Sequence, residues 1–353
     1  VLCDYYWQPV NINSMDYIRG FTQNRITNYR SSSLALTRYT HYQAVLPEMN
    51  SSVPIKSGNY LLKVFLDGDI NKVVFTKRMY VVEPIASIAA AVVQPINPQF
   101  FSTHQKIKFN ANLRGINSFS AAQQVKAVIL QNNRMDNALI DIPPTFVRGN
   151  SLEFSSENIG VFDAGKEWRW LDIRSFSLQS DRVETAKYNK TSTDIYLKPD
   201  VDRSAQRYSY FQDYNGMYYI FTYESVNPKW QGDYATVYFS FAPPNGMLYP
   251  KKDIYILGDF TGYKLTDQWK LIYNEETKLY ETTAFLKQGV YNYSYILVDQ
   301  SDPGYISSLE GSSWETENGY TIFLYYRSFT DRSDQLIGVS QINSRKDRLG
   351  LGY

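Results

Sequence analysis

The sequence has very few of the residues on which most catalytic and metal sites depend. Its 353 residues include one cysteine, Cys3, and two histidines, His41 and His104. A single cysteine excludes an internal disulfide, and two distant histidines do not supply the close set that hydrolytic zinc sites use. H-E-x-x-H, nucleophile-elbow, P-loop and dinucleotide-binding motifs are also missing. We therefore predict no catalytic residue, no cofactor and no metal site, so the protein is not expected to be an enzyme. A hydrolase that uses an unrecognised pair of catalytic carboxylates among the 35 acidic residues stays an alternative.

The chain also lacks long apolar runs and an excess of either charge. Its most apolar stretch, "VVEPIASIAAAVVQPI" (81–96), is interrupted by prolines and is shorter than the roughly 18 residues of a membrane span. A net charge of +1 gives no general field for nucleic acid or anionic lipid. We expect neither nucleic acid nor a membrane span. The opening "VLCDYYW" has no signal-peptide pattern, and Leu2 stands where a lipidated Cys3 would need a small residue.

What the chain has in abundance is tyrosine, with 31 copies. Aromatic and β-branched residues suit the pleated, half-buried surface of a sheet. No segment keeps a helical spacing for more than two turns, and "SFSAAQQVKAV" (118–128) is the best short helix candidate. The composition therefore favours strands.

Short alternating segments with turns about every ten residues predict antiparallel sandwiches. In "HQKIKFNANLR" (104–114) the apolar face is Ile107, Phe109, Ala111 and Leu113. The fold class predicted is all-β, with three tandem immunoglobulin-like β-sandwich domains. The boundaries predicted are 1–85 for a first, N-terminally incomplete sandwich, 86–203 for the second, 204–343 for the third, and 344–353 for a C-terminal tail.

The third block contains "LKQGVYNYSYILVD" (286–299), in which tyrosine recurs at every second position. We interpret Tyr291, Tyr293 and Tyr295 as one face of a central strand whose hydroxyls find hydrogen-bond partners, with Gly289 letting the chain turn into the strand.

Three segments of this block, "VYFSFAPP", "IYILGDFTGY" and "LIYNEETKLYETTAFLKQGVYNYSYIL", resemble the early-set type of immunoglobulin-like domain. Domains of this type precede the catalytic barrel of glycogen-branching enzymes or bind glycogen in kinase subunits. In such domains aromatic rings stack on sugars, and Trp230, Tyr263 and Trp269 are the candidates here. A carbohydrate-binding β-sandwich module is therefore the alternative function.

The segment "GKEWRWLDIRS" (165–175) places four charged residues around two tryptophans. One interpretation is a strand with salt bridges whose aromatic face packs on the core. The other is a patch that binds a partner.

Ten segments, in order along the chain, together resemble one family, the plug protein of the type IX secretion system of Bacteroidota. These segments are "CDYYW", "YIRGF", "YTHYQAVLP", "SGNYLLKVFLDGD", "QNNRMDNA", "KEWRWLDIRS", "GDYATVYFSF", "LKQGVYNYSY", "LEGSSWETEN" and "DRSDQLIG". The family's first domain begins several strands before "CDYYW", so the resemblance implies that a signal peptide and a leading segment precede these residues.

This resemblance implies a non-enzymatic protein of the periplasm, associated with the inner face of the outer membrane. Its partner would be the large outer-membrane β-barrel translocon, whose periplasmic opening the family seals when no cargo is engaged. No small-molecule substrate is expected. Because reversible interfaces use exposed Tyr, Trp and Arg anchors, we expect Trp230, Tyr263 and Trp269 to be the partner-binding residues.

Overall fold

The fold is almost entirely β, which confirms the predicted class. The computed structural model describes residues 1–47, 52–116, 120–302, 304 and 306–347. Strands take up 45% of the chain and helices 6%. The described chain forms two compact units, each built from separate stretches of sequence: Val1–Thr27, Ala44–Asp163 and Asn318–Tyr353 in the first, and Asn28–Gln43 and Ala164–Glu317 in the second.

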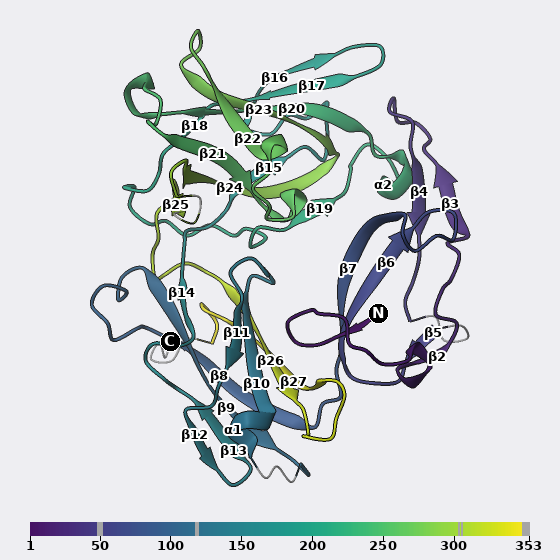
Figure 1. The fold of residues 1–353 in the computed structure, drawn as a ribbon. Coiled ribbons are helices and arrows are strands. Elements are labelled where there is room, and N and C mark those ends of the chain that lie inside the picture. The colour runs from purple at the N-terminus through teal and green to yellow at the C-terminus, as the bar shows by residue number, and fades with distance from the viewer. Residues whose placement is uncertain (48–51, 117–119, 303, 305, 348–353) are drawn as a thin grey trace. The chain divides into compact units, whose positions relative to one another are not determined.

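The first unit contains four sheets (Figure 1). Its elements are β1 (Leu2–Cys3), η1 (Ser14–Asp16), β2 (Ile18–Gly20), β5 (Ser52–Pro54), β6 (Gly58–Phe65), β7 (Val73–Val81), β8 (Ala86–Val93), β9 (His104–Leu113), α1 (Ala121–Gln124), β10 (Val125–Gln131), β11 (Leu139–Ile142), β12 (Phe146–Arg148), β13 (Ser151–Phe154), β14 (Val161–Asp163), β26 (Gly319–Tyr326) and β27 (Gln335–Asn343). One pair of sheets, β11-β10-β26-β27 and β12-β13-β9-β14 with β8 beside β9, makes a sandwich.

The alternation in β9 sets the core of this sandwich, as predicted. Ile107, Phe109, Ala111 and Leu113 are all buried, and they share one apolar cluster with residues of β10, β13 and β26. The best short helix candidate, residues 118–128, is confirmed only in part. Only the four residues of α1 are helical, and the strand β10 starts at Val125, because the β-branched run that follows packs into the sandwich. Residues 117–119 lie outside the described part.

The C-terminal hairpin does not join the strands that precede it in sequence. Sequence order puts residues 319–343 in the third block, but β26 pairs along its full length with β10, from Val125 opposite Tyr326 to Gln131 opposite Tyr320. The opposite face of this sheet meets the N-terminal residues. The Tyr80 ring stacks on Phe323 at 4.2 Å, and the Tyr325 hydroxyl donates to Asn59 Oδ1 at 2.8 Å.

The second unit holds one continuous sheet and a hairpin from the N-terminal region. Its elements are β3 (Asn28–Ser31), β4 (Thr40–Gln43), β15 (Arg169–Asp172), β16 (Val183–Tyr188), β17 (Thr193–Leu197), β18 (Asp200–Val201), β19 (Tyr218–Ile220), α2 (Pro228–Gln231), β20 (Tyr234–Ala242), η2 (Pro244–Gly246), β21 (Lys252–Leu257), η3 (Asp259–Thr261), η4 (Asp267–Trp269), β22 (Lys270–Asn274), β23 (Leu279–Lys287), β24 (Gly289–Asp299) and β25 (Ile306–Ser308). The sheet runs β15-β24-β21-β22-β23-β20-β17-β16, with β18, β19 and β25 paired beside this path.

The tyrosines of β24 form the buried face predicted for them. Tyr293 and Tyr295 are fully buried, and their rings meet Phe239 and Phe241 of β20 across the core. The hydroxyls of Tyr293 and Tyr295 donate to Asp200, and that of Tyr291 donates to the Lys287 carbonyl. Each buried hydroxyl therefore keeps the partner that burial requires.

Gly289 has a different role from the one predicted. Its φ lies outside the left-handed region, so no turn requires glycine here. A Cβ at this position would instead lie 2.4 Å from the backbone oxygen of Tyr219 in β19. Glycine is needed because two backbones approach closely.

Candidate partner-binding surfaces

Trp230, the first predicted anchor, lies in α2 and supports the β3–β4 hairpin. The Arg30 guanidinium lies 4.7 Å from the centre of the indole, and the His41 ring lies 6.3 Å away. The backbone N–H of Ser33 donates to the Trp230 carbonyl at 2.9 Å. The indole is half-buried by these contacts.

Tyr263 and Trp269, the other two predicted anchors, are also half-buried. The Tyr263 ring packs edge-on against Trp168, and its hydroxyl donates to the Gly216 carbonyl at 3.2 Å. Trp269 meets Phe260 edge-on and packs against the main core of the second unit. Each of the three rings therefore packs on a different neighbour. Protein covers part of each ring.

The β3–β4 hairpin is attached to the second unit by Asp233. The carboxylate oxygens of Asp233 accept from the backbone N–H groups of Leu36 at 2.7 Å and Thr37 at 3.0 Å. The Tyr39 hydroxyl donates to the Gly232 carbonyl at 2.7 Å. These bonds place an N-terminal segment firmly on α2 and the strand that follows it (Figure 1).

Lys287 lies beneath the same hairpin. Its Nζ donates to the Lys229 carbonyl at 2.7 Å and lies 4.0 Å from the centre of the Tyr39 ring. Burial lowers the pKa of Lys287 to about 8. The nearby carboxylate of Asp233 favours the charged form and opposes this effect.

An exposed aromatic segment, residues 214–226, follows the edge of the sheet at β19. β19 pairs with β24 and with no other described strand. Tyr219 and Tyr223 are 59% and 61% exposed, and Phe221 lies between them with ring contacts to both. The Arg174 guanidinium lies 4.8 Å from the centre of the Tyr223 ring. Tyrosine beside arginine on an open surface is the composition of protein interfaces.

A second exposed surface lies at the end of the β6–β7 hairpin, which we name the apolar hairpin tip. It comprises Leu66, Ile70, Val73, Val74 and Phe75, all of them exposed, with Phe75 at 54%. The pairing of Val64 with Phe75 and of Phe65 with Val73 puts apolar side chains on both faces. β7 is the edge of the β1-β6-β7 sheet. An exposed apolar edge strand is an interaction surface unless something covers it.

The charged strand at 165–175 combines both interpretations. Trp168, just before β15, is buried, but Trp170 within β15 is 40% exposed, so an aromatic face packed on the core is wrong for Trp170. Arg169 is buried in ion pairs with Asp200 and Glu310, and Arg174 pairs with Asp172.

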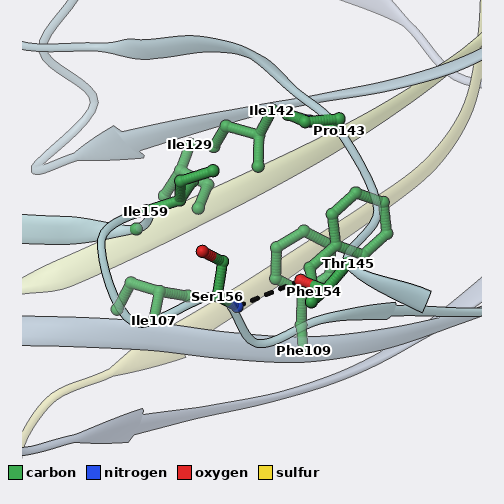
Figure 2. Close-up of a pocket in the computed structure, with 10 residues that line it drawn as sticks. Ile107, Phe109, Ile129, Ile142, Pro143, Thr145, Phe154, Ser156 and Ile159 are labelled. Carbon is green, nitrogen blue, oxygen red and sulfur yellow. Dashed lines mark hydrogen bonds between the residues drawn. The ribbon is translucent and has the colours of Figure 1, made fainter. Parts of the chain in front are cut away.

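The first unit contains a small internal cavity and a buried cysteine. The cavity lies between the two sheets of the sandwich, with Ile107, Phe109, Ile129 and Phe154 among its walls (Figure 2). Its volume of about 10 Å³ has room for no more than one water. Cys3 is fully buried in β1, and burial raises the pKa of its thiol. No group of three metal-ligating residues is placed for a metal among the described residues, and none of the helices described is long and apolar enough to cross a membrane.

The two exposed surfaces were not predicted as sites. The alternation of Tyr219, Phe221 and Tyr223 is visible in the sequence, but the same period marks the buried tyrosines of β24. Periodicity identifies a strand and its two faces, and it does not say which face is covered.

Comparison with known proteins gives a matching family model and a solved structure of similar fold. The family described as "Type 9 secretion system plug protein 1st domain" matches residues 1–83. A solved structure, the crystal structure of a hypothetical protein from Parabacteroides merdae ATCC 43184, is 29% identical, with a TM-score of 0.90, over 97% of this chain and 86% of that one. None of the curated proteins matches. The family resemblance is confirmed over residues 1–83, and it supports a role in type IX secretion and a periplasmic or envelope-associated location.

Proposed function

Because residues 1–83 carry the first domain of the type 9 secretion system plug protein family, we propose that this chain is a periplasmic plug without enzymatic activity. It binds the large outer-membrane β-barrel translocon at the inner face of the outer membrane. It seals the periplasmic opening of that barrel when no cargo is engaged.

The observation that carries this proposal is the apolar hairpin tip, which lies inside the matched domain. Leu66, Val74 and Phe75 are each more than half exposed, and Val74 and Phe75 lie on β7, the edge strand of its sheet. A partner that covers the tip gains the hydrophobic free energy of these side chains. It can also add strand pairing at the edge.

The aromatic segment 214–226 is a second surface for the same partner. Its tyrosines offer wide rings and polar hydroxyls, which suit an interface that forms and is released. Trp230, Tyr263 and Trp269 belong to the proposal as weaker anchors, because protein contacts already cover part of each ring.

The decisive experiment is capture of the barrel from gently solubilised outer membranes, with partners identified by mass. We expect the wild-type protein to recover a large outer-membrane barrel. Phe75→Glu places a charge in the apolar contact and should weaken capture roughly tenfold or more, as at an interface hot spot. Ile272→Glu, at a site on β22 that is 64% exposed, is the matched control and should capture the barrel normally.

A double variant, Tyr219→Ala with Tyr223→Ala, tests the aromatic segment in the same assay. Barrel recovery that is unchanged by both the hairpin-tip variant and this double variant would contradict the assignment of the surfaces. Recovery of the wild-type protein only as a free monomer would contradict the proposed function itself.

Sealing is tested separately from binding. Cells without this protein should admit small periplasm-excluded dyes faster than wild-type cells, and the wild-type gene should restore the barrier. The Phe75→Glu gene should restore it poorly, and the Ile272→Glu gene fully. Equal dye entry with and without the protein would show that it binds without sealing.

A further inference from the structure

The second unit contains a pocket whose lining is rich in arginine. The pocket has a volume of about 200 Å³ and lies beside β15 and β18. Its walls are Arg169, Trp170, Arg182, Asp200, Arg203 and Phe211. This volume is below the range of sites for whole cofactors or drug-sized ligands, so the pocket suits a single small chemical group.

Asp200 organises two of the three arginines. Its Oδ1 accepts from Nη1 of Arg169 and from an Nη of Arg182, both at 2.6 Å. Its Oδ2 accepts from the hydroxyls of Tyr293 at 2.8 Å and Tyr295 at 3.0 Å. All the acceptor capacity of this carboxylate is therefore used inside the fold.

Glu310 organises the other side of the cluster. It accepts from Nε of Arg169 at 3.0 Å, and also from Nε of Arg203. Arg203 uses one Nη group on the Glu167 carbonyl. The cluster therefore holds three guanidinium groups against two carboxylates, which leaves one positive charge in excess.

Part of the donor capacity of the arginines is not used by the protein. Arg182 donates to Lys198, Asp200 and Tyr293 through a single Nη group. Its Nε and other Nη donate to none of the described residues, and neither does the second Nη of Arg203. These side chains are 23% and 16% exposed, so the spare donors can be reached from solvent.

We propose that this pocket binds a carboxylate carried on a short apolar stem. The planar guanidinium forks match the two oxygens of a carboxylate. The rings of Trp170 and Phe211 provide apolar walls for the stem. One excess positive charge is balanced by a monovalent carboxylate, whereas a phosphate dianion would leave the site negative.

The carboxylate has two possible sources, an acidic group of a protein partner or a free organic acid. Both share the chemistry that the pocket recognises. The inference does not depend on the proposed sealing function, because it concerns the isolated protein and a different part of the chain.

The test is calorimetric titration of the whole protein in a buffer free of carboxylate and phosphate. The probes are hexanoate, the peptide acetyl-Ala-Ala-Leu with a free carboxylate, the same peptide as its amide, and inorganic phosphate. Hexanoate and the free-acid peptide should bind saturably, and the amide should not. Tighter binding of the peptide indicates a protein partner, and tighter binding of hexanoate indicates a free acid.

Arg182→Gln removes the spare guanidinium donors of Arg182, and with them one positive charge, and should weaken carboxylate binding roughly tenfold or more. In this variant Asp200 keeps its hydrogen bonds with Arg169 and with two tyrosine hydroxyls, so the fold should persist. Lys190→Gln, at an exposed position in the β16–β17 turn, is the matched loss of charge and should bind normally. Trp170→Ala keeps every charge and should weaken hexanoate binding through loss of the apolar wall. If Arg182→Gln does not fold, Trp170→Ala is the deciding variant, and unchanged hexanoate binding in it would contradict the proposal.

Three results would overturn the proposal: no saturable binding of either carboxylate, binding of phosphate alone, or equal binding of the peptide and its amide. Unchanged affinity in folded Arg182→Gln would also overturn it.

Discussion

Asp200 is the residue whose replacement should most damage the second unit. It is 4% exposed and accepts hydrogen bonds from Arg169, Arg182, Tyr293 and Tyr295. Asp200→Asn keeps the shape but replaces one oxygen with an NH₂ group, which would face donors instead of accepting from them. The change also removes the negative charge that compensates the buried guanidinium of Arg169.

The expected loss follows from these contacts. Removing one partner of a buried ion pair costs about 3–5 kcal/mol. The tyrosine hydroxyls that lose an acceptor would add about 1–3 kcal/mol if they stayed unpaired. Rearrangement of the side chains around the neutral asparagine offsets part of this loss. We expect the free energy of unfolding to fall by about 3–5 kcal/mol, a large part of the roughly 5–15 kcal/mol that stabilises a typical domain.

The assay is urea denaturation followed by tryptophan fluorescence, since Trp168 and Trp170 flank Arg169 in sequence. Asp181→Asn is the control, because Asp181 is exposed and has no hydrogen bond or ion pair among the described residues. It should change the free energy of unfolding by less than about 0.5 kcal/mol. A loss below about 1 kcal/mol for Asp200→Asn would refute the reasoning, because it would mean that the network is not required for the fold.

Three further predictions concern other parts of the second unit. Asp233→Ala should release the β3–β4 hairpin and speed its cleavage by a protease several-fold. Asp267→Ala, which removes an exposed acid in η4, should leave the cleavage rate unchanged. Equal cleavage rates in the two variants would argue against the attachment. Burial raises the pKa of Asp213 to about 6, so its contribution to stability is complete below its unfolded value near 3.8 and is lost as the pH rises through 6. Relative to Asp213→Asn, the wild type should therefore lose up to about 3 kcal/mol between pH 4 and pH 7 in urea titrations, and a pH-independent difference would contradict this. Gly289→Ala should push β19 away from β24 and lower the free energy of unfolding by about 1–3 kcal/mol. The separation should appear as faster amide hydrogen exchange at Tyr219. Unchanged exchange at Tyr219 would show that the two backbones can separate freely.

The local structure was largely predictable from the sequence. The alternation in β9 and in β24 identified strands and their buried faces, because the side-chain period of a strand is two wherever it lies in the fold. The short extent of the helix within the candidate segment 118–128 has a physical cause. Alanine and glutamine favour a helix locally, but the run from Val125 gains more by packing between β11 and β26.

The connection of the strands was not predictable in the same way. β26 lies beside β10 although more than half the chain separates them, and residues 28–43 join the second unit although their neighbours in sequence join the first. Consecutive strands are neighbours only about two-thirds of the time, and nothing in a strand's own residues names its partner. The positions of the domain boundaries therefore stay a prediction.

The pocket escaped prediction for a related reason. Arg169 and Arg174 were visible as charges near two tryptophans, but Arg182, Asp200 and Glu310 come from other segments. Only the closure of the sheet brings their charges together. A charged residue on a strand is ordinarily solvated, and burial with an excess of one sign is a property of the assembled site.

The abundance of tyrosine has two separate physical consequences in this protein. In β24 the rings fill the core, and each hydroxyl has a protein acceptor, so a polar side chain is buried at little cost and the unit becomes rigid. At residues 214–226 the same side chain lies on an open edge, where its hydroxyl remains hydrated until a partner replaces the water. The reversible docking proposed for this chain would use both. Replacing buried tyrosines should therefore lower stability and leave docking intact in the molecules that still fold. Replacing exposed tyrosines should leave stability unchanged and weaken docking.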